Sequence, residues 1–524
     1  MAGRSSRVAL GALVFAVAAC AQLAGLDGYG PAVGGSGDGA GPEGGGGTSS
    51  AGGGGAGGQP PTACDTALPW AAVFKGMIDG AVVRVSALAS DACETYVGLA
   101  ADGPVEGFVP PQGGDADGYV MRYEPNGDRG WVTSVGGIFG QHVRAIAVEP
   151  DRVWIGGDND GGLEINGNAI SGSGGFVFAL DRQTGERIPT EDVIVRDDDS
   201  ATVVRVHDVA VDGDVVHTVG EFGGQLEVNL QAVGPSCSPS PCGMWITTRD
   251  DRAPDVRVFQ AVNGNGQDGR FVVEDILVVG DKVVLAAQVV GAWGGITVAA
   301  RDAVVVVYGG EPISEISRHH FIGSGEERVV GLAPLGTEGD AVIALVAHSA
   351  ELSQWDLDSQ MAVALAPSQP SSTVTAVELR LDGAVVSSLA PWEGVLGQTS
   401  FANDVIGRRQ LVSDPMGALR AVGGAVDDAN LDGINAIDLL VPDPLLFTVA
   451  LTPSATTLVD VADSPHTFSE GSVVQTLSHV ALAGDHEVIG GYHGPDAMPV
   501  DGSPAITSGF AGFVIQRETG AGGR

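Results

Sequence analysis

A repeated pattern of three short apolar runs is the feature that most constrains how this chain can fold. In the clearest copy, residues 131–180, the alternating runs VRAIAV and RVWIGG are followed by a Gly/Asn/Asp loop and a third run, GFVFAL. Two period-2 runs joined by a tight turn predict a β-hairpin. Because no helical periodicity separates the runs, the pattern predicts antiparallel strands throughout.

Similar blocks recur along most of the chain. Further hairpin patterns begin at Val82, Val206, Val273, Val329, Val374 and Leu477, and third runs begin at Gly118, Gly175, Gly243, Ala303, Met361, Leu445 and Gly512. The mean spacing of about 66 residues, with four strands in each unit, predicts the blades of a β-propeller. The alternatives are a row of β-sandwiches or a solenoid, and a solenoid would require terminal caps that the sequence does not show.

The two ends of the repeat region predict how the ring closes. Residues 70–84, WAAVFKGMIDGAVVR, align with residues 131–144, which form the outer strand before a new hairpin. The repeat region therefore begins with an outer strand that belongs to no preceding blade, and it ends after a third strand, residues 512–517. Pairing of the two partial blades leaves no open edge. We expect an all-β chain with a single propeller of seven four-stranded blades, the last combining residues 70–76 with the C-terminal strands.

The N-terminus has the layout of a bacterial export signal. Arg4 and Arg7 precede an apolar run, residues 8–19, which is too short to span a bilayer and predicts a signal peptide. Val17-Ala18-Ala19-Cys20 resembles the bacterial lipobox, which implies that Cys20 becomes a lipid-modified first residue. The resemblance further implies an outer-membrane lipoprotein, because the next residue is Ala21 and not Asp. The alternative is an ordinary signal peptide with an incidental cysteine.

The remaining boundaries follow from composition. Residues 28–61 are almost entirely Gly, Ala, Ser and Pro, so we expect residues 20–63 to form a lipidated N-terminus with a disordered tether. The propeller is expected over residues 64–518, with an irregular sixth unit at about 367–451, followed by a disordered tail over residues 519–524. The formal charge of −39 repels phosphate backbones and excludes nucleic acid as a partner. We expect a monomer held at the lipid bilayer through Cys20.

Four cysteines follow the predicted lipid attachment site, namely Cys64, Cys93, Cys237 and Cys242. An even number in an oxidising compartment predicts two disulfides. Four cysteines allow three pairings, and we expect a local Cys237–Cys242 loop that leaves Cys64 to pair with Cys93. A metal site would need closer clusters or histidines at ligand spacing.

One region resembles a known family of repeats. In residues 118–181, the loop GLEINGNAISGSGG leads into GFVFALD, a pattern similar to the SBBP-type β-propeller repeats of bacterial secreted proteins. The resemblance is close in this region and weaker elsewhere. It implies a propeller on an extracytoplasmic protein and supplies no catalytic residues. The loop over residues 156–175 is therefore interpreted as a connection typical of these repeats and not as a functional site.

Sequence motifs for catalysis are absent. No G-x-S-x-G elbow, H-E-x-x-H helix or phosphate-binding G-x-x-x-x-G-K-[ST] loop occurs. His207 and His217 flank one hairpin and are interpreted as structural. The short clusters DADG at residues 115–118 and DNDG at residues 158–161 predict turns.

The sequence contains one candidate metal loop. Asp428, Asn430 and Asp432 occupy positions 1, 3 and 5 of a possible calcium loop, with Gly433 at the bend and Asp438 at position 11. The loop resembles that of dockerin modules, although those carry the closing acid at position 12. Calcium is therefore the one cofactor that the sequence suggests, and an acidic solvated loop is the alternative.

Two functions are compatible with these features. The first is a non-catalytic binding or scaffold propeller, anchored to the envelope, for a protein or glycan partner. The second is an extracytoplasmic propeller enzyme of the lyase or glycosidase type, with paired carboxylates at the mouth of the channel.

Overall fold

The computed structural model describes residues between 69 and 518, and every regular element within them is a β-strand. The described residues are 69–91, 93–109, 117–170, 173–197, 204–213, 215–228, 231–233, 243–249, 255–260, 270–293, 296–310, 314–336, 339–348, 350–356, 361–366, 373–382, 385–388, 392–395, 410–413, 419–431, 434–437, 445–452, 455–462, 476–483, 486–494 and 509–518. The predicted signal peptide, tether and tail lie outside these ranges.

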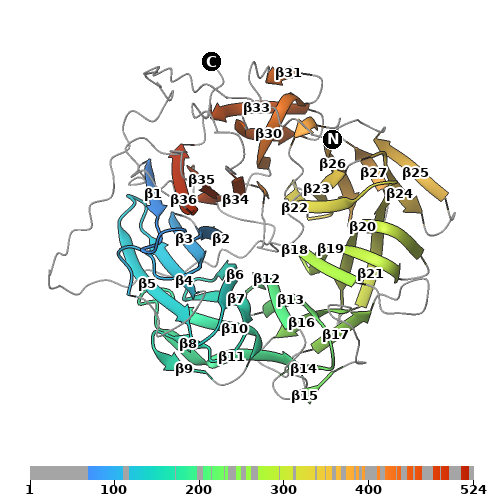
Figure 1. Ribbon diagram of the computed structural model, residues 1–524. Helices are drawn as coiled ribbons and strands as arrows, with labels where there is room; N and C mark the ends of the chain where they lie inside the picture. Colours follow the sequence, from blue (N-terminus) through green and yellow to red (C-terminus); the bar gives the residue numbers. More distant parts are fainter. Residues whose placement is uncertain are drawn as a thin grey trace, which may run out of the picture.

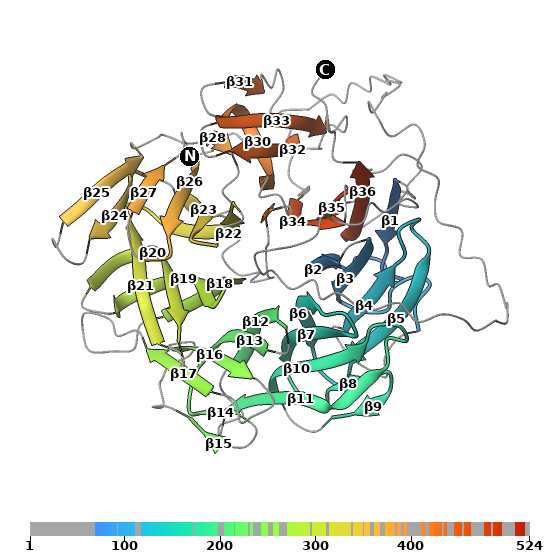
Figure 2. The ribbon, with the colours of Figure 1, turned by 180° about the vertical axis from the view of Figure 1, so that it is seen from behind.

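The strands form sheets arranged in a ring (Figures 1 and 2). Seven of the described strands follow one another around the centre in chain order, each packed against the next and the last packed against the first. They are β2 (Val83–Asp91), β6 (Gln141–Val148), β12 (Val204–Asp212), β18 (Arg270–Val279), β22 (Glu327–Leu335), β29 (Leu411–Ser413) and β34 (Thr476–Ala483). This arrangement is a β-propeller, and the predicted fold class is confirmed.

The first three sheets are antiparallel and continue outwards from their inner strands. The first sheet contains β2, β3 (Glu94–Ala101), β4 (Asp117–Tyr123), β5 (Arg129–Gly136), β8 (Glu164–Ile165) and β9 (Asn168–Ala169). The second contains β6, β7 (Arg152–Asn159), β10 (Gly174–Asp181), β11 (Arg187–Asp197), β14 (Leu226–Val228) and β15 (Gln231–Ala232). The third contains β12, β13 (Val215–Phe222), β16 (Gly243–Arg249) and β17 (Asp255–Gln260).

The other three sheets complete the ring. The fourth sheet contains β18, β19 (Lys282–Trp293), β20 (Ile296–Gly309), β21 (Ser314–Ile322), β24 (Leu352–Asp356) and β25 (Met361–Ala366). The ten-stranded sheet contains β22, β23 (Ala341–His348), β26 (Thr373–Arg380), β27 (Val385–Ser388), β28 (Trp392–Val395), β29, β30 (Leu419–Leu431), β31 (Ile434–Ile437), β32 (Leu445–Thr452) and β33 (Ala455–Ala462). The closing sheet contains β34, β35 (His486–His493), β36 (Ala511–Glu518) and β1 (Trp70–Phe74).

The closing sheet joins the two ends of the repeat region. β1 pairs antiparallel with β36 in a register that runs from Trp70 opposite Gln516 to Phe74 opposite Gly512. β36 in turn pairs with β35, and β35 with β34. The predicted composite blade is therefore confirmed.

Two four-stranded sets are joined in the ten-stranded sheet. β22, β23, β26 and β27 form one set, and β29, β30, β32 and β33 form the other. β28 pairs with both β26 and β30 and so links the sets into one sheet. Because of this link, the count of seven separate blades stays a prediction.

Three sheets gain a fifth and a sixth strand from the next unit along the chain. β8 and β9 lie between β7 and β10 in sequence but pair with β5, and β14 pairs in the same way with β11. The loop over residues 156–175, which the sequence predicted to be a simple connection, thus contains the strand pair β8 and β9, which extends the preceding sheet.

The fourth sheet has such an extra edge pair, β24 and β25, and this changes the places of two predicted strands in the fold. The run at Met361, expected to be a third strand, is β25 and pairs with β24 at the edge of the fourth sheet. The third strand of that unit is β26, which pairs with β23. The predicted hairpin that begins at Val374 is formed by β26 and β27, but it provides the outer two strands of this unit and not the inner two of the next. An apolar run has the same composition in a central strand and in an edge strand, so the sequence alone did not separate them.

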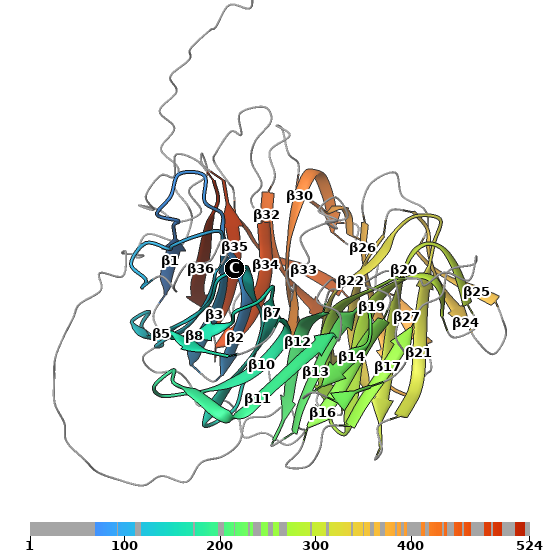
Figure 3. The same ribbon diagram turned by 60° about the horizontal axis from the view of Figure 1, so that its bottom comes forward.

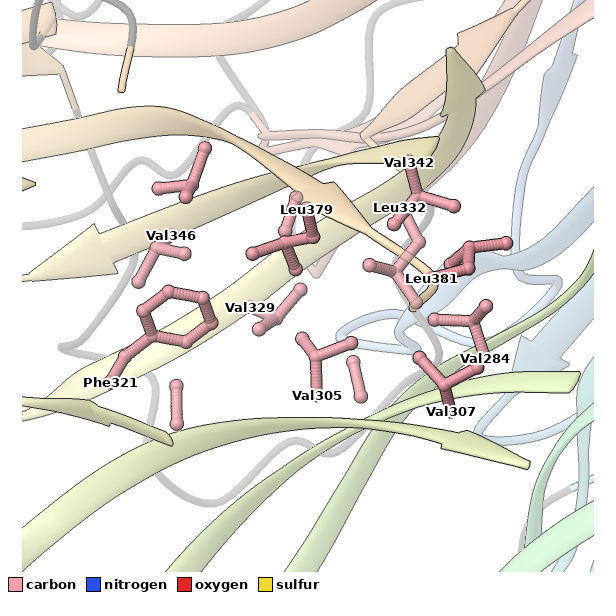
Figure 4. Close-up of a cluster of buried hydrophobic side chains, with 14 of the residues drawn as sticks. Val284, Val305, Val307, Phe321, Val329, Leu332, Val342, Val346, Leu379 and Leu381 are labelled. Atoms are coloured by element: carbon pink, nitrogen blue, oxygen red, sulfur yellow. The ribbon is translucent and has the colours of Figure 1, made fainter. Parts of the chain in front are cut away.

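The core lies between neighbouring sheets. Figure 4 shows valines of the fourth sheet, including Val305 and Val307 on β20, facing Val342 and Val346 on β23. All four side chains are fully buried. Burying each such side chain contributes about 1.5–3 kcal/mol, which explains why the runs are rich in valine.

Tryptophan–glycine contacts join neighbouring sheets at their outer edges. Trp131 on β5 covers Gly185, in the turn between β10 and β11, and a Cβ atom on Gly185 would lie 2.6 Å from the indole ring. The Trp131 indole N–H also donates to the Arg182 carbonyl oxygen, at 2.9 Å. Trp70 on the composite sheet covers Gly127 in the same way. The sequence alignment of residues 70–84 with 131–144 therefore reflects equivalent packing.

We expect Gly185→Ala to destabilise the protein more than Gly213→Ala. Both glycines have a positive φ, of 70° and 57°, so each substitution costs about 1 kcal/mol in backbone strain. Only the Gly185 substitution also meets a ring, which adds about 1–3 kcal/mol of overpacking, whereas nothing lies within 4 Å of the Gly213 position. Urea unfolding of both variants measures the difference, and equal losses would contradict the packing role of Trp131.

Candidate functional site

A partly polar recess lies at the centre of the ring, where inner strands of five sheets meet. This central recess is lined by Ala87, Leu88, Arg144, Ala145, Ile146, His207, Asp208, Glu274, Asp275 and His479. These residues come from β2, β6, β12, β18 and β34. The recess is therefore formed jointly by five of the seven inner strands.

A β-bulge at the same point of β6, β12 and β18 turns polar side chains towards the recess. The register shifts between Val143 and Ala145 on β6, between Val206 and Asp208 on β12, and between Val273 and Asp275 on β18. The extra residues at these bulges are Arg144, His207 and Glu274. A bulge redirects the side chain that it carries, which places these three on the wall of the recess.

Two aspartates next to the bulges connect adjacent sheets. Asp208 Oδ2 accepts a hydrogen bond from the Ile276 backbone N–H, at 3.0 Å. Asp275 Oδ2 accepts the equivalent bond from the Leu332 backbone N–H, at 2.9 Å. A charge-assisted bond to a buried backbone N–H is stronger than a neutral one, so both carboxylates hold the ring together.

The second sheet contains a buried ion pair at the wall of the recess. Arg144 Nε donates to Asp158 Oδ1, and His142 Nδ1 lies 3.3 Å from Asp158 Oδ2. Burial of Asp158 opposes its ionisation, but the Arg144 charge and the His142 contact hold the pKa of this carboxyl well below its usual range. Asp158 was predicted to lie in a turn. The structure instead places it at the end of β7, buried against these partners.

The third sheet repeats the arrangement with different residues. Glu221 Oε1 lies 3.0 Å from Arg205 Nη1 and 3.4 Å from His207 Nε2. Burial again opposes ionisation, yet the nearby His207, Arg205 and Arg144 lower the pKa of Glu221. His207 and His217 are both buried, as expected for structural histidines.

A third ion pair crosses from the fourth sheet to β22. Arg328 Nη2 lies 2.5 Å from Glu274 Oε2, so the bulge residue of β18 is held by the next inner strand. Arg144, His207, Asp208, Glu274 and Asp275 thus all have partners within the ring. The polar lining of the recess therefore has a structural role.

Glu327 is a buried carboxyl of a different kind. It begins β22, its side chain is fully buried, and neither of its carboxyl oxygens makes a hydrogen bond of ordinary geometry among the described residues. Burial raises the pKa of Glu327 to about 8, supported by the negative charges of Asp302, Glu351 and Glu326 and opposed by the Gly325 N–H. Asp302 itself contacts His320 Nε2, at 2.9 Å.

Asp117 is a second buried acid, and its position differs from the turn that the sequence predicted. Asp117 was expected in a turn, but it is the first residue of β4 and is buried. Burial raises its pKa to about 6. Acidic residues at the ends of strands are therefore not all solvated turn residues in this chain.

The loops at one end of the first and second sheets expose large apolar side chains. They are Met77 and Ile78 between β1 and β2, Val109 between β3 and β4, and Ile138 and Phe139 between β5 and β6, with exposures from 53% to 83%. We call these five residues the loop patch. They share one end because β2 and β6 begin there and β3 and β5 end there.

Neighbouring loops support the patch residues. The Met77 N–H donates to the Pro104 carbonyl oxygen, at 2.8 Å, which ties the β1–β2 loop to the β3–β4 loop. A Cβ atom on Gly161 would lie 3.1 Å from the Phe139 ring, so the β5–β6 loop packs against the loop after β7. The apolar side chains are thus exposed on loops that contact other loops.

Most of the predicted site residues fall outside the described part of the chain. Cys20, Cys64, Cys237 and Cys242 lie there, whereas Cys93 is described and is disulfide-bonded. The predicted pairing of the cysteines and the lipidation of Cys20 stay predictions.

The predicted calcium loop is only partly described. Asp428 and Asn430 lie in β30, which forms a hairpin with β31, while Asp432 and Asp438 lie outside the described residues. In the described ranges, no three His, Cys, Asp or Glu side chains are grouped so that they could hold a metal ion. Calcium binding at residues 428–438 stays a prediction.

The two aspartates that connect adjacent sheets have a recognisable sequence pattern. Asp208 and Asp275 occupy the same offset in the patterns VHDVAV and VEDILV. An apolar strand with an acidic residue at the same place in two copies indicates a shared structural contact. The ion pairs carried no such signal, because Arg144 and Asp158 come from different strands.

Comparisons with known proteins show distant structural likeness only. No family model and no curated protein matches the chain, so the SBBP resemblance stays a prediction. A quinohemoprotein alcohol dehydrogenase from Comamonas testosteroni is similar over 86% of this chain and 79% of its own, with 9% identity and a TM-score of 0.35. An endosialidase of phage phi92 is similar over 87% and 70%, with 8% identity and a TM-score of 0.32. The chemistry of these proteins does not transfer to this chain.

The described residues include no helix that is long and apolar enough to cross a membrane.

We expect Glu327→Gln to make the protein more stable at pH 8 than the unsubstituted chain. The folded-state pKa of Glu327, about 8, lies above its ordinary value of 4.5. Stability that depends on the neutral carboxyl is complete below pH 4.5 and is lost as the pH rises to 8, by about 2–4 kcal/mol. The amide stays neutral and avoids this loss.

Urea unfolding at pH 4.5, 6 and 8 measures the effect. The gain from Glu327→Gln should increase with pH, and the exposed Glu106→Gln serves as a control with little change at any pH. A gain that is the same at every pH would show that Glu327 is not held neutral by burial.

Proposed function

We propose that this chain is an envelope-anchored lipoprotein whose propeller acts as a non-catalytic binding or scaffold module for a protein or glycan partner. The loop patch is the observation that carries the binding role, because several large exposed apolar side chains on loops at one end of a fold are typical of interaction surfaces. Its members are mainly aliphatic, with a single aromatic ring at Phe139, which favours a protein over a glycan.

The non-catalytic role is supported by the state of the recess wall. The carboxylates of Asp158, Glu221 and Glu274 face arginine partners, and those of Asp208 and Asp275 accept backbone hydrogen bonds. Breaking a buried ion pair costs about 3–5 kcal/mol, so these groups are poorly suited to exchange protons with a substrate.

The alternative is a lyase or glycosidase that acts at the channel mouth. Glu327 favours it, because a carboxyl kept neutral near pH 7 can serve as a general acid, with Asp302 as the second carboxylate. Full burial of Glu327 weighs against direct contact with a substrate. Glycan cleavage that is lost in Glu327→Gln would establish the enzyme.

The binding role predicts that Ile78→Asp with Phe139→Asp abolishes partner capture. A charge in an apolar contact is left unpaired and desolvated, so the yield of the captured partner should fall at least about tenfold. The tagged full-length protein is used as bait with envelope extracts, and capture is repeated with the purified partner. Ile316→Asp, at an exposed isoleucine on β21, is the matched control and should retain the partner. Equal capture by the double variant would rule out the loop patch.

The anchoring role predicts that Cys20→Ala moves the protein out of the membrane fraction. Several acyl chains on one residue hold a protein stably, since each buried methylene contributes about 0.8 kcal/mol. Membrane and soluble fractions are compared for the two proteins by immunoblot. Recovery of Cys20→Ala in the membrane fraction would contradict lipid anchoring without affecting the binding proposal.

A further inference from the structure

The outer edge of the fourth sheet carries a second exposed surface, separate from the loop patch. β25 is its last strand, and Met361, Ala362, Val363 and Ala364 are all exposed there, Met361 by 64% and Val363 by 46%. Figures 1 and 3 show β25 at the rim of the ring, beyond β24. The strand therefore presents both apolar side chains and an edge of backbone.

β25 is less protected than the corresponding edges of the first two sheets. Those sheets end in β9 and β15, which have two residues each and contain Asn168 and Gln231. β25 has six residues and no charged or polar side chain. In the described part of the chain it pairs only with β24. Long, uncharged edge strands offer free backbone groups to an added strand, and most proteins avoid them.

The charge around this edge indicates what kind of strand would pair with it. The sequence between Arg328 and Arg380 contains no lysine or arginine. Within this segment, acidic residues stand at both ends of β24, the strand that pairs with β25: the exposed Glu351 directly precedes β24, and Asp356, its last residue, lies opposite Met361. A second copy would bring two such acidic segments together in a chain of net charge −39, which disfavours self-association. A strand with cationic ends is attracted by the same field.

We propose that β25 binds an extended segment of another protein by strand addition, and that this segment has apolar side chains flanked by lysine or arginine. Backbone hydrogen bonds to the free edge provide affinity, as in other cases of β-augmentation. The apolar side chains of Met361 and Val363 pack against those of the added strand. The cationic ends of the segment face the acidic surroundings, so binding weakens as salt is added.

A designed peptide tests this proposal on the full-length chain. The probe is a fluorescein-labelled peptide of alternating valine and threonine, long enough to span the six residues of β25, with two lysines at each end. A matched peptide carries glutamates in place of the lysines. Fluorescence anisotropy should give a dissociation constant at least about tenfold lower for the lysine peptide.

Substitutions on β25 test whether the peptide binds at this strand. Val363→Lys places a charge on the strand and should weaken binding of the lysine peptide at least about tenfold. Val363→Thr keeps a neutral β-branched residue and should bind as before, as should Ala169→Lys on β9. Circular dichroism and thermal unfolding confirm that all three variants stay folded.

Three results would overturn the proposal. Unchanged binding by Val363→Lys would place the peptide elsewhere, and equal binding of the glutamate peptide would remove the charge requirement. A concentration-dependent dimer that is lost in Val363→Lys, detected by light scattering, would assign the edge to a second copy of this chain. None of these results bears on the loop patch, which is tested by partner capture.

Discussion

The pairing of β1 with β36 is the contact on which the rest of the ring depends. It joins residues more than four hundred positions apart, from Trp70 opposite Gln516 to Phe74 opposite Gly512. Without it the closing sheet would lack its outer strand and β36 would present a free edge. Because the first and last described strands pair within one sheet, the ring is continuous, and each sheet then packs against two neighbours.

Polar contacts fix how the neighbouring sheets are placed, whereas valine and leucine supply the area that they bury. Asp208 and Asp275 each reach the backbone of the next inner strand, and Glu274 reaches Arg328 in the same direction. At the outer edge, Trp131 covers Gly185 of the following sheet. Apolar packing tolerates sliding between sheets, but these directional contacts do not. The polar lining of the recess is thus specialised for assembly, and the exposed loop patch and β25 remain as the surfaces that we propose bind other molecules.

The sequence predicted the elements whose pattern is local. Hairpins joined by Asp and Gly turns, the third strands at Gly118 and Gly175, and the composite sheet at Trp70 were all visible as alternation and repetition. The sequence did not separate β25 from a central strand, because exposure depends on what lies beside the strand.

The errors at the candidate site have a related cause. Asp117 and Asp158 resemble turn residues, since Asp and Gly favour turns, but distant partners and burial decide their positions. Arg144 pairs with Asp158 across a hairpin, at a bulge that the alternation of side chains does not reveal. The burial of Glu327 depends on the fourth sheet, which packs against β22 from a separate part of the chain.

Hydrogen exchange of the intact protein, resolved by mass spectrometry, tests ring closure most directly. We expect the backbone amides of Trp70–Phe74 and Ala511–Glu518 to be protected to a similar degree as those of β7, because both strands lie within one closed structure. Exchange of Trp70–Phe74 at the rate of a free peptide, with β7 still protected, would contradict closure of the ring by this strand pair.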